Sequence, residues 1–453
     1  MLDVVPLRPE GLVGRIQHPE SSIQYLLRRS TSIGSAQASG GHLAVIYLDN
    51  NATTQVAPEV VDAMMPFLTG QYFNPSSMYE AARGPADAIG DARKKIARLL
   101  GHTRPSEVLF TSCASESNNT AVFGTIAANP ERRHIITTAV EHPAIFEVAL
   151  DLQRRGFEVD FVPVDTQGRI DKTEFVRALR PDTLLVSVMH ANNESGVISP
   201  VQELSRITKE TDPSIIFHTD ATQTVGKLEI NLRDSFKHVD LLSFSGHKLH
   251  APKGIGALYI RRGTRCRPFL LGGHQEDGRR AGTENVAFIV GLASALELAM
   301  EGRDEDVPRI TAMRDRLEKE LVARIPYLEV NGGEAERLDN TLNVACHFIE
   351  GEGILFQLSE HGICASSGSA CTSGSLEPSH VLRAMKVPFS AVHGSVRFSL
   401  SRFNTESEID TVIEVFPGIV ASLRRLSPYW DAAKNQPRPE GLEMLEQTDM
   451  PQA

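Results

Sequence analysis

Short apolar segments alternate with helical segments from about residue 45 to residue 302, and this alternation restricts the fold more than any other feature. Apolar runs of this length, separated by helices, predict a mostly parallel β-sheet covered by helices on both faces. The expected strands are 45–48, 108–110, 134–140, 158–164, 184–189, 215–218, 239–244 and 255–260. Sheets of this kind bind ligands at the carboxyl ends of their strands, so the residues that follow each strand are the functional candidates.

The pattern becomes less regular after residue 302 and predicts a second, smaller α+β domain. Helices are expected at 282–302 and 310–324, with a domain boundary near 303–308. We therefore expect a large domain over 45–305, a small C-terminal domain over 306–430 and a polar, disordered tail over 431–453. Residues 1–44 predict a disordered arm, and their arginines leave an organelle presequence as the alternative.

Composition excludes several classes of protein. Lys and Arg number 46 against 57 Asp and Glu, a net charge of −11, which argues against nucleic-acid binding. No apolar stretch is long enough to span a bilayer. Five cysteines in 453 residues, with no Cys-x-x-Cys pair, argue against both a secreted disulfide framework and a zinc ribbon. These features predict a cytoplasmic enzyme with no membrane or nucleic-acid partner.

Two predicted strand ends carry groups that suit pyridoxal 5'-phosphate (PLP). Lys248 follows one strand, and a desolvated lysine offers the neutral amine that Schiff-base chemistry needs. Asp220 follows another strand, and PLP needs an acid partner for its ring nitrogen. Gln223 is close enough in sequence to bond the ring hydroxyl. A solvated loop lysine and a turn acid are the alternatives.

Three other strand ends carry polar groups that fit the same cofactor. The backbone N–H groups of Ala114 and Ser115 precede a predicted helix and can receive a phosphate, although Ser115 could simply cap the helix. His142 can stack on a flat ring, and Asn193 can contact a substrate carboxylate or the ring hydroxyl; ordinary turn residues are the alternative for both. One shared site explains all five strand ends more simply than five coincidences do.

Cys371 lies in a loop of small residues, 365–375, and is the candidate reactive thiol. A cysteine among Ser, Gly and Thr is accessible, whereas a structural cysteine such as Cys346 lies among apolar neighbours. A bystander cysteine is the alternative at 371. Cys113, Cys346 and Cys364 are expected in strands or at strand ends, and Cys266 in a basic surface turn.

Together these motifs resemble the cysteine desulfurases, PLP-dependent enzymes of fold type I, from about Tyr47 to Trp430. The matching segments are Tyr47-Leu-Asp-Asn-Asn-Ala-Thr-Thr54, Asn74-Pro-Ser-Ser77, Ser245-Gly-His-Lys248, Gly282-Thr-Glu-Asn285 and Ser369-Ala-Cys-Thr-Ser373. The Cys371 loop, Leu249-His-Ala-Pro-Lys-Gly254 and Ser427-Pro-Tyr-Trp430 resemble the NifS branch, which supplies sulfur for nitrogenase iron–sulfur clusters. The resemblance implies the large domain of fold type I, with its seven-stranded sheet, and a smaller C-terminal domain.

The resemblance also implies a role for each matching residue. Lys248, His142 and Cys371 are implied to be catalytic, and Cys371 to be a possible transient ligand of an iron–sulfur cluster shared with a scaffold. The implied cofactor-binding residues are Ala114, Ser115, His142, Asn193, Asp220, Gln223, Ser245, Gly246, His247, Lys248 and Thr283. Thr283 would reach the phosphate of the partner subunit, which implies a homodimer. Ser115 stands where many family members have Thr, and its hydroxyl is expected to keep the phosphate contact.

Arg397 and Asn193 are implied to bind the substrate carboxylate, for which a guanidinium fork is well shaped. A surface cation at a strand edge is the alternative for Arg397. The implied reaction converts L-cysteine and an acceptor thiol into L-alanine and a persulfide on Cys371, which then passes to a scaffold for iron–sulfur assembly. Two other functions remain open: another fold-type-I enzyme, such as a selenocysteine lyase or an aminotransferase, and a non-catalytic protein that binds metal or sulfur.

Overall fold

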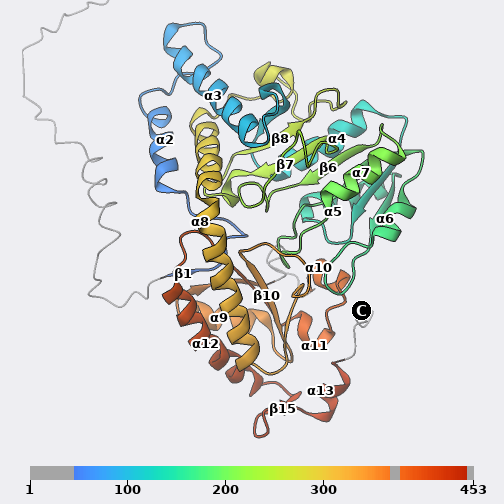
Figure 1. Ribbon diagram of the computed structural model, residues 1–453, viewed down its shortest axis with the longest axis vertical. Helices are drawn as coiled ribbons and strands as arrows, with labels where there is room; N and C mark the ends of the chain where they lie inside the picture. The colour runs from blue at the N-terminus through green and yellow to red at the C-terminus, as the bar shows by residue number, and fades with distance from the viewer. Residues whose placement is uncertain (1–44, 368–377, 446–453) are drawn as a thin grey trace, which may run out of the picture. The chain divides into compact units, whose positions relative to one another are not determined.

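A seven-stranded sheet forms the larger part of the protein in the computed structural model, which describes residues 45–367 and 378–445 (Figure 1). The strand order is β2-β8-β7-β6-β5-β3-β4, and β8 runs antiparallel to both neighbours while the other pairs are parallel. The strands are β2 (Val108–Thr111), β3 (His134–Thr138), β4 (Glu158–Val162), β5 (Thr183–Ser187), β6 (Ile216–Asp220), β7 (Leu241–Ser245) and β8 (Gly256–Ile260). The predicted mostly parallel sheet is confirmed.

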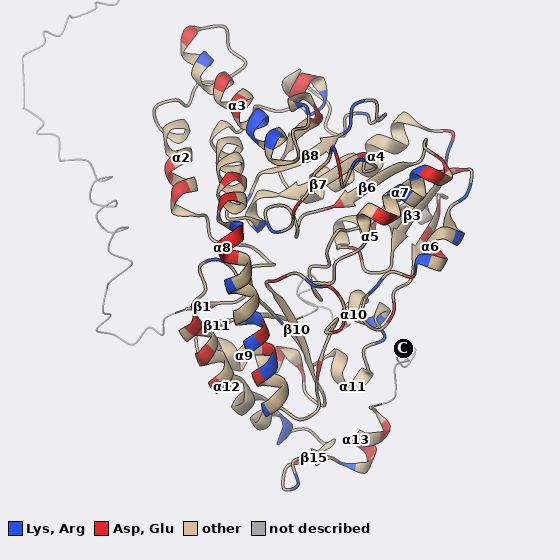
Figure 2. Cartoon of the chain, in the orientation of Figure 1, with Lys and Arg blue, Asp and Glu red and all other residues tan. Residues whose placement is uncertain are grey.

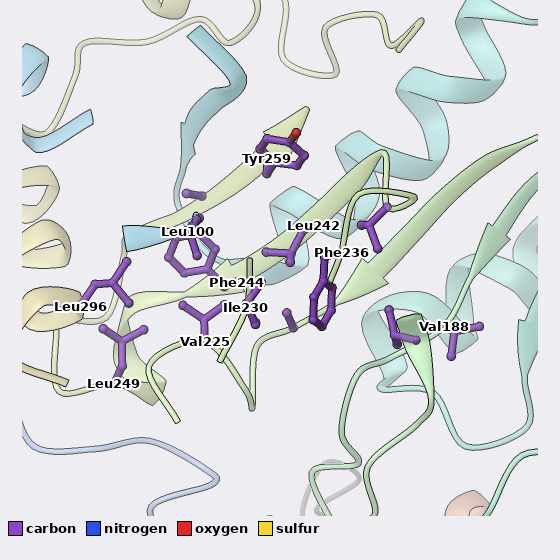
Figure 3. Close-up of a cluster of buried hydrophobic side chains, with 14 of the residues drawn as sticks. Leu100, Val188, Val225, Ile230, Phe236, Leu242, Phe244, Leu249, Tyr259 and Leu296 are labelled. Atoms are coloured by element: carbon purple, nitrogen blue, oxygen red, sulfur yellow. The ribbon is translucent and has the colours of Figure 1, made fainter. Parts of the chain in front are cut away.

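Both faces of this sheet are covered, because successive residues of each strand point to opposite sides. Leu242 and Phe244 of β7 join one hydrophobic cluster, whereas Leu241 joins another. The first cluster includes side chains of α3 (Arg83–Leu99), α7 (Val201–Thr211) and α8 (Val286–Arg324), and the second those of α4 (Ala114–Ala128) and α5 (Pro143–Arg154). Figure 3 shows Phe244 in the first cluster with Leu249 and Leu296. The strands are therefore apolar on both sides, as expected for a covered sheet.

A four-stranded sheet, β12-β13-β10-β9, organises the C-terminal part of the chain. Its strands are β9 (Leu328–Val330), β10 (Thr341–Cys346), β12 (Ser366–Ser367) and β13 (Ser395–Ser399). A third cluster packs β10 and β13 against α9 (Gly351–Glu360) and α12 (Glu406–Arg424). The two-stranded pair of β1 (Ile46–Tyr47) and β11 (Ile363–Cys364) joins the start of the described chain to this part. The strand expected at 45–48 therefore forms, but the expectation that it belongs to the larger sheet is wrong.

One continuous helix, α8, connects the two parts, and the predicted break near 303–308 is wrong. Pro308 lies inside α8, where it removes one backbone donor. The helix continues because it is buried at both ends: Leu292 and Leu296 belong to the first cluster, and Leu317 and Leu321 to the third. Figure 1 shows α8 running from the larger sheet to the smaller one. The predicted domain division at 305/306 falls inside this helix and stays a prediction.

The segment after Trp430 is folded as far as the described residues extend, so the expectation of a wholly disordered tail is wrong for 431–445. It forms a hairpin of β14 (Trp430–Asp431) and β15 (Gln436–Pro437), followed by α13 (Pro439–Glu443). Trp430 anchors it, because its ring is buried and the Arg424 guanidinium lies 4.4 Å from the ring centroid. The polar composition of the tail gave no sign of this single apolar anchor.

The remaining helices lie on the outside of these sheets. They are α2 (Pro58–Leu68), α6 (Lys172–Ala178), α10 (His380–Ala384) and α11 (Phe389–Val392). Charged residues of both signs occupy helices and loops, and the strands of the larger sheet carry few of them (Figure 2). Among the described residues, no helix combines the length and the apolar character that crossing a membrane requires.

Candidate active site

A cavity of about 340 Å³ lies at the carboxyl ends of β2, β3, β5, β6 and β7. It is lined by most of the residues that the sequence singles out: Ala114, Ser115, His142, Asn193, Asp220, Gln223, Ser245, His247, Lys248 and Arg397. Gly246 and Thr283 do not line it. Each buried strand is followed by a polar loop. Because parallel strands have their carboxyl ends at the same edge of a sheet, the polar residues of these loops lie close together.

Asp220 is the last residue of β6 and is 4% exposed. Its Oδ2 accepts a hydrogen bond of 2.7 Å from Asn118 Nδ2, and its Oδ1 accepts one of 2.9 Å from Thr222 N. These hydrogen bonds satisfy both oxygens of the carboxyl group, which counters the cost of burying polar atoms. Asp220 is therefore a fixed, buried acid rather than a turn residue facing solvent.

Lys248 ends a short 3-10 turn, Gly246–Lys248, that directly follows β7. Its Nζ donates to Asn51 O at 2.6 Å and to Ala52 O at 2.7 Å. The turn is held in place because Leu249 is buried in the first cluster (Figure 3). The solvated loop lysine considered for Lys248 does not match this position.

Gly246 has a packing role in this turn. A Cβ at this position would lie 2.9 Å from Ile255 Cγ2 and 3.0 Å from Ala251 Cβ, and the Gly246 N–H already donates to Ile255 O at 2.9 Å. Any larger residue would push the turn, and with it Lys248, away from β8. Gly246 does not line the cavity, but its lack of a side chain lets the turn that carries Lys248 pack against Ile255 and Ala251.

Unpaired donors gather where α4 begins. Cys113 is the N-cap of α4 and makes no side-chain cap, so Ala114 and Ser115 are the first two helical residues and Ser115 is not the cap. The first N–H groups of a helix have no partner within the helix and attract anions. Ser245 Oγ is buried with no hydrogen-bond partner among the described residues. These groups at one end of the cavity can hold a phosphate.

Glu116 lies in the first turn of α4 but does not line the cavity. Its carboxylate accepts from Ser112 N at 2.7 Å and from Arg280 Nε at 2.9 Å. Burial would raise the pKa of Glu116, but the hydrogen bonds from Arg280 and Ser112 outweigh it and lower that pKa. The negative charge is thus paired and leaves the N-terminus of α4 attractive to an anion.

His142 combines two roles that the sequence left as alternatives. Its Nδ1 accepts from Ala144 N at 3.1 Å, so it caps α5, while its ring also lines the cavity. Burial is the main cause that lowers the pKa of His142; Lys248 adds to this and Asp220 opposes it. A neutral imidazole fixed in this way is suited to stacking on a flat ring.

Arg397 lies in β13, an inner strand of the smaller sheet, and is 4% exposed. Its Nη1 donates to Asn193 O at 2.8 Å and its Nη2 to Asp49 Oδ1 at 2.7 Å. Arg397 Nε and Asn193 Oδ1 are both buried without a partner in the described part of the chain. The alternative of a surface cation at a strand edge is wrong, and the Arg397 Nε–H is a donor that suits a carboxylate ligand.

The sequence model of the family Aminotransferase class-V matches residues 46–412. A cysteine desulfurase of Trichormus azollae is 54% identical over 387 residues, which are 85% of this chain and 96% of the relative. The cysteine desulfurase NifS of Azotobacter vinelandii is 52% identical over 388 residues, 86% of this chain and 96% of the relative. A solved NifS-like protein superposes with a TM-score of 0.79 at 38% identity, covering 84% of this chain and all of that one.

The chain belongs to the cysteine desulfurases of the aminotransferase class-V family. The family is PLP-dependent and has fold type I, and the predicted fold, cofactor and desulfurase activity are thereby confirmed. The residues that line the cavity fit this cofactor. One cavity of suitable size brings together the Lys248 amine, the buried Asp220 and the first N–H groups of α4. It also contains the Ser245 hydroxyl, which has no hydrogen-bond partner among the described residues.

Several residues of this desulfurase site were missed by the sequence reasoning. Asn118 contacts Asp220, Asn51 provides a carbonyl to Lys248, and Asp49 pairs with Arg397. Asn118 lies one helical turn after Ala114 and so on the same face of α4, a spacing that could have found it. Asn51 and Asp49 lie in the segment 47–54 that resembles the family, but the neighbouring sequence does not show that they contact Lys248 and Arg397.

Thr283 is exposed, lies before α8 and stays outside the cavity of its own chain. Its predicted contact with a partner subunit stays a prediction. Cys371 lies outside the described residues, so its catalytic and metal-ligating roles also stay predictions. In the described ranges no group of three or more His, Cys, Asp or Glu is arranged to hold a metal.

The described cysteines include three whose thiols are held protonated. Burial raises the pKa of Cys346 to about 12 and that of Cys266 to about 11, and burial and Asp49 raise the pKa of Cys364. Cys266 lies in a basic turn as expected, but its thiol packs inward and donates to Thr120 O at 3.6 Å. A thiol with a raised pKa is a poor nucleophile at neutral pH.

Proposed function

We propose that this cysteine desulfurase forms a persulfide on Cys371 and passes the sulfur to an iron–sulfur scaffold protein that serves nitrogenase. When bound, PLP withdraws electrons from the Cα of the amino acid that it holds. The sulfur of L-cysteine leaves Cβ and forms an S–S bond with the Cys371 thiolate, and the carbon skeleton takes up protons and leaves as L-alanine. The protein is thus a PLP-dependent sulfurtransferase.

Each residue of the cavity has a part in this proposal. Lys248 attaches the cofactor through its amine and, once released, moves the Cα proton. Asp220 keeps the ring nitrogen protonated, Gln223 bonds the ring hydroxyl oxygen, and His142 stacks on the ring. The phosphate is held by Ala114, Ser115, Ser245 and His247, with Thr283 from the partner subunit. Arg397 and Asn193 bind the substrate carboxylate, and Arg397 is already oriented by Asp49.

The proposal rests on one observation: Lys248 and Asp220 line the same cavity as the first N–H groups of α4 and the Ser245 hydroxyl. These hydrogen-bond donors can bind an anion, and Ser245 Oγ has no partner among the described residues. A metal-binding protein without catalysis would need neither the lysine nor the buried acid. The acceptor and the nitrogenase link rest on the similarity to relatives named cysteine desulfurase and NifS. The homodimer and the cytoplasmic location are likewise part of the proposal.

Borohydride reduction tests the attachment point directly. Reduction should bleach the visible absorption of the bound cofactor and leave it covalently attached to the peptide that contains Lys248. Lys248→Ala should carry no such label and should produce no alanine from cysteine. Lys253→Ala is the matched control, because Lys253 is exposed five positions further on, and it should be labelled at Lys248 and fully active.

A label on another lysine, or alanine production by Lys248→Ala at near the wild-type rate, would overturn the assignment. Formation of 3-mercaptopyruvate, in which the sulfur stays on the carbon skeleton, in place of alanine and sulfide would instead identify an aminotransferase.

A further inference from the structure

Lys227 lies four residues after Gln223, and its ammonium contacts that side chain but does not line the cofactor cavity. The segment turns back on itself here, with Lys227 N donating to Thr224 O at 2.9 Å. Lys227 Nζ donates to Gln223 Oε1 at 3.3 Å. Because an ammonium group has donors and no acceptor, Gln223 must present its amide oxygen to Lys227.

This contact decides which end of the Gln223 amide faces the cofactor cavity. Gln223 is 4% exposed, and its Nε2 donates to Asn51 O at 3.1 Å. An amide –NH₂ has two hydrogens, so one remains for an acceptor in the cavity. Turning the amide over would set the –NH₂ against the Lys227 ammonium and the amide oxygen against the Asn51 carbonyl. Two repulsive contacts therefore oppose the flip.

The Lys227 ammonium is held in a setting that is costly for a charge. Burial is the main cause that lowers its pKa to about 8; Arg397 lowers it further, and Asp339 opposes both. A second cavity of about 70 Å³ lies next to Lys227 and is also lined by Asp339, whose Oδ1 is buried without a partner in the described segments. An apolar side chain would avoid this cost, which points to a task for the ammonium group.

We propose that Lys227 is a positioning residue that holds Gln223 as a hydrogen-bond donor toward the ring hydroxyl oxygen of PLP. Lys227 does not touch the cofactor in this account and acts only through Gln223. The inference rests on the proposed role of Gln223 in binding the ring. A fixed donor favours the ionised ring oxygen, so Lys227 influences both the affinity for PLP and the pH at which the visible absorption of the bound cofactor changes.

A double-mutant cycle tests this indirect action. The variants are Lys227→Met, Gln223→Ala and the two combined, and the measurements are the PLP dissociation constant and the midpoint of the pH titration of the visible band. Lys227→Met alone should weaken PLP binding about tenfold and shift the midpoint upward, as expected for loss of an oriented hydrogen bond to a charged oxygen. In the Gln223→Ala background the same substitution should change the affinity by less than about twofold.

Two further variants separate positioning from general effects of charge. Lys227→Arg keeps a cationic donor and should restore most of the affinity. Lys237→Met removes an exposed lysine from the same segment and should leave both readouts unchanged. Thermal melting of each apoprotein checks folding, and Lys227→Gln replaces Lys227→Met in the cycle if the methionine variant does not fold.

An equal effect of Lys227→Met in both backgrounds would overturn the inference, because Lys227 would then act without Gln223. An unchanged dissociation constant and midpoint in Lys227→Met would also overturn it. Equal dissociation constants for PLP in the wild-type protein and in Gln223→Ala would contradict the proposed role of Gln223. That outcome is distinguishable from a failure of Lys227 alone.

Discussion

Replacing Asn118 by alanine should weaken the site without removing any group that touches the substrate. Asn118 is fully buried in α4, and its Nδ2 gives Asp220 its 2.7 Å hydrogen bond. The variant removes this donor and leaves the bond from Thr222 N to the other carboxylate oxygen. Asp220 is then oriented by one hydrogen bond fewer, so its interaction with the ring nitrogen of PLP should weaken.

The size of the effect follows from these contacts. A hydrogen bond to a charged group contributes about 1.5–3 kcal/mol, which corresponds to roughly 10- to 100-fold. Asp220 keeps one bond, and Asn118 Oδ1 has no partner among the described residues to lose. We therefore expect Asn118→Ala to fall near the lower limit, about tenfold weaker PLP binding and about tenfold slower alanine production.

Asn129→Ala is the matched control. Asn129 is a buried asparagine at the other end of α4, and its Nδ2 donates to Thr125 O at 2.8 Å. The two positions are eleven residues apart, about 16 Å along a helix. Both variants should lower the melting temperature, but only Asn118→Ala should lower PLP affinity in a fluorescence titration. Normal PLP affinity and a normal rate of alanine production in Asn118→Ala, or equal losses in both variants, would show that the Asn118 hydrogen bond to Asp220 does not support PLP binding.

Three other predictions concern pH, substrate and assembly. Burial raises the pKa of Glu141 from 4.5 to about 8, so the folded protein holds a proton that the unfolded chain releases, and stability should fall as pH rises between these values. Glu141→Gln should make that fall shallower by about 1.4 kcal/mol per pH unit, and equal slopes in denaturant titrations would contradict this. Arg397→Lys should raise the KM for cysteine about tenfold because the bidentate fork is lost, and an unchanged KM would count against carboxylate binding there. Mixing inactive Lys248→Ala and Thr283→Ala chains should restore some activity, and no recovery after verified subunit exchange would argue against a shared site.

The larger sheet and most of its site could be predicted because the information is local. Each strand is an apolar run, and each functional group follows a strand by a few residues, so the rule for parallel sheets places Asp220 and Lys248 together. Arg397 could not be located in this way, since it reaches the cavity from the smaller sheet through contacts with Asn193 and Asp49. Its role came only from the family resemblance.

Other features depended on long-range packing. The two helices expected at 282–302 and 310–324 are one helix, because buried leucines on both sides of Pro308 keep α8 continuous. Trp430 fixes the start of a polar tail by packing against Arg424, Tyr327 and Phe348, which are distant from it in sequence or outside the tail. The link from Lys227 to Gln223 is local in sequence, yet only the three-dimensional structure shows that the half-buried Lys227 donates to the amide oxygen.

In the proposed reaction, the sulfur of L-cysteine is transferred to the thiol of Cys371. The most direct measurement is the mass of the protein after treatment with cysteine, mapped to individual peptides. We expect one extra sulfur on the peptide that contains Cys371, and none on Cys266 or Cys346, whose thiols are held protonated. Cys371→Ala should bind PLP and L-cysteine but release no sulfide. An extra sulfur on any other cysteine with none on Cys371, or full desulfurase activity in Cys371→Ala, would contradict the account.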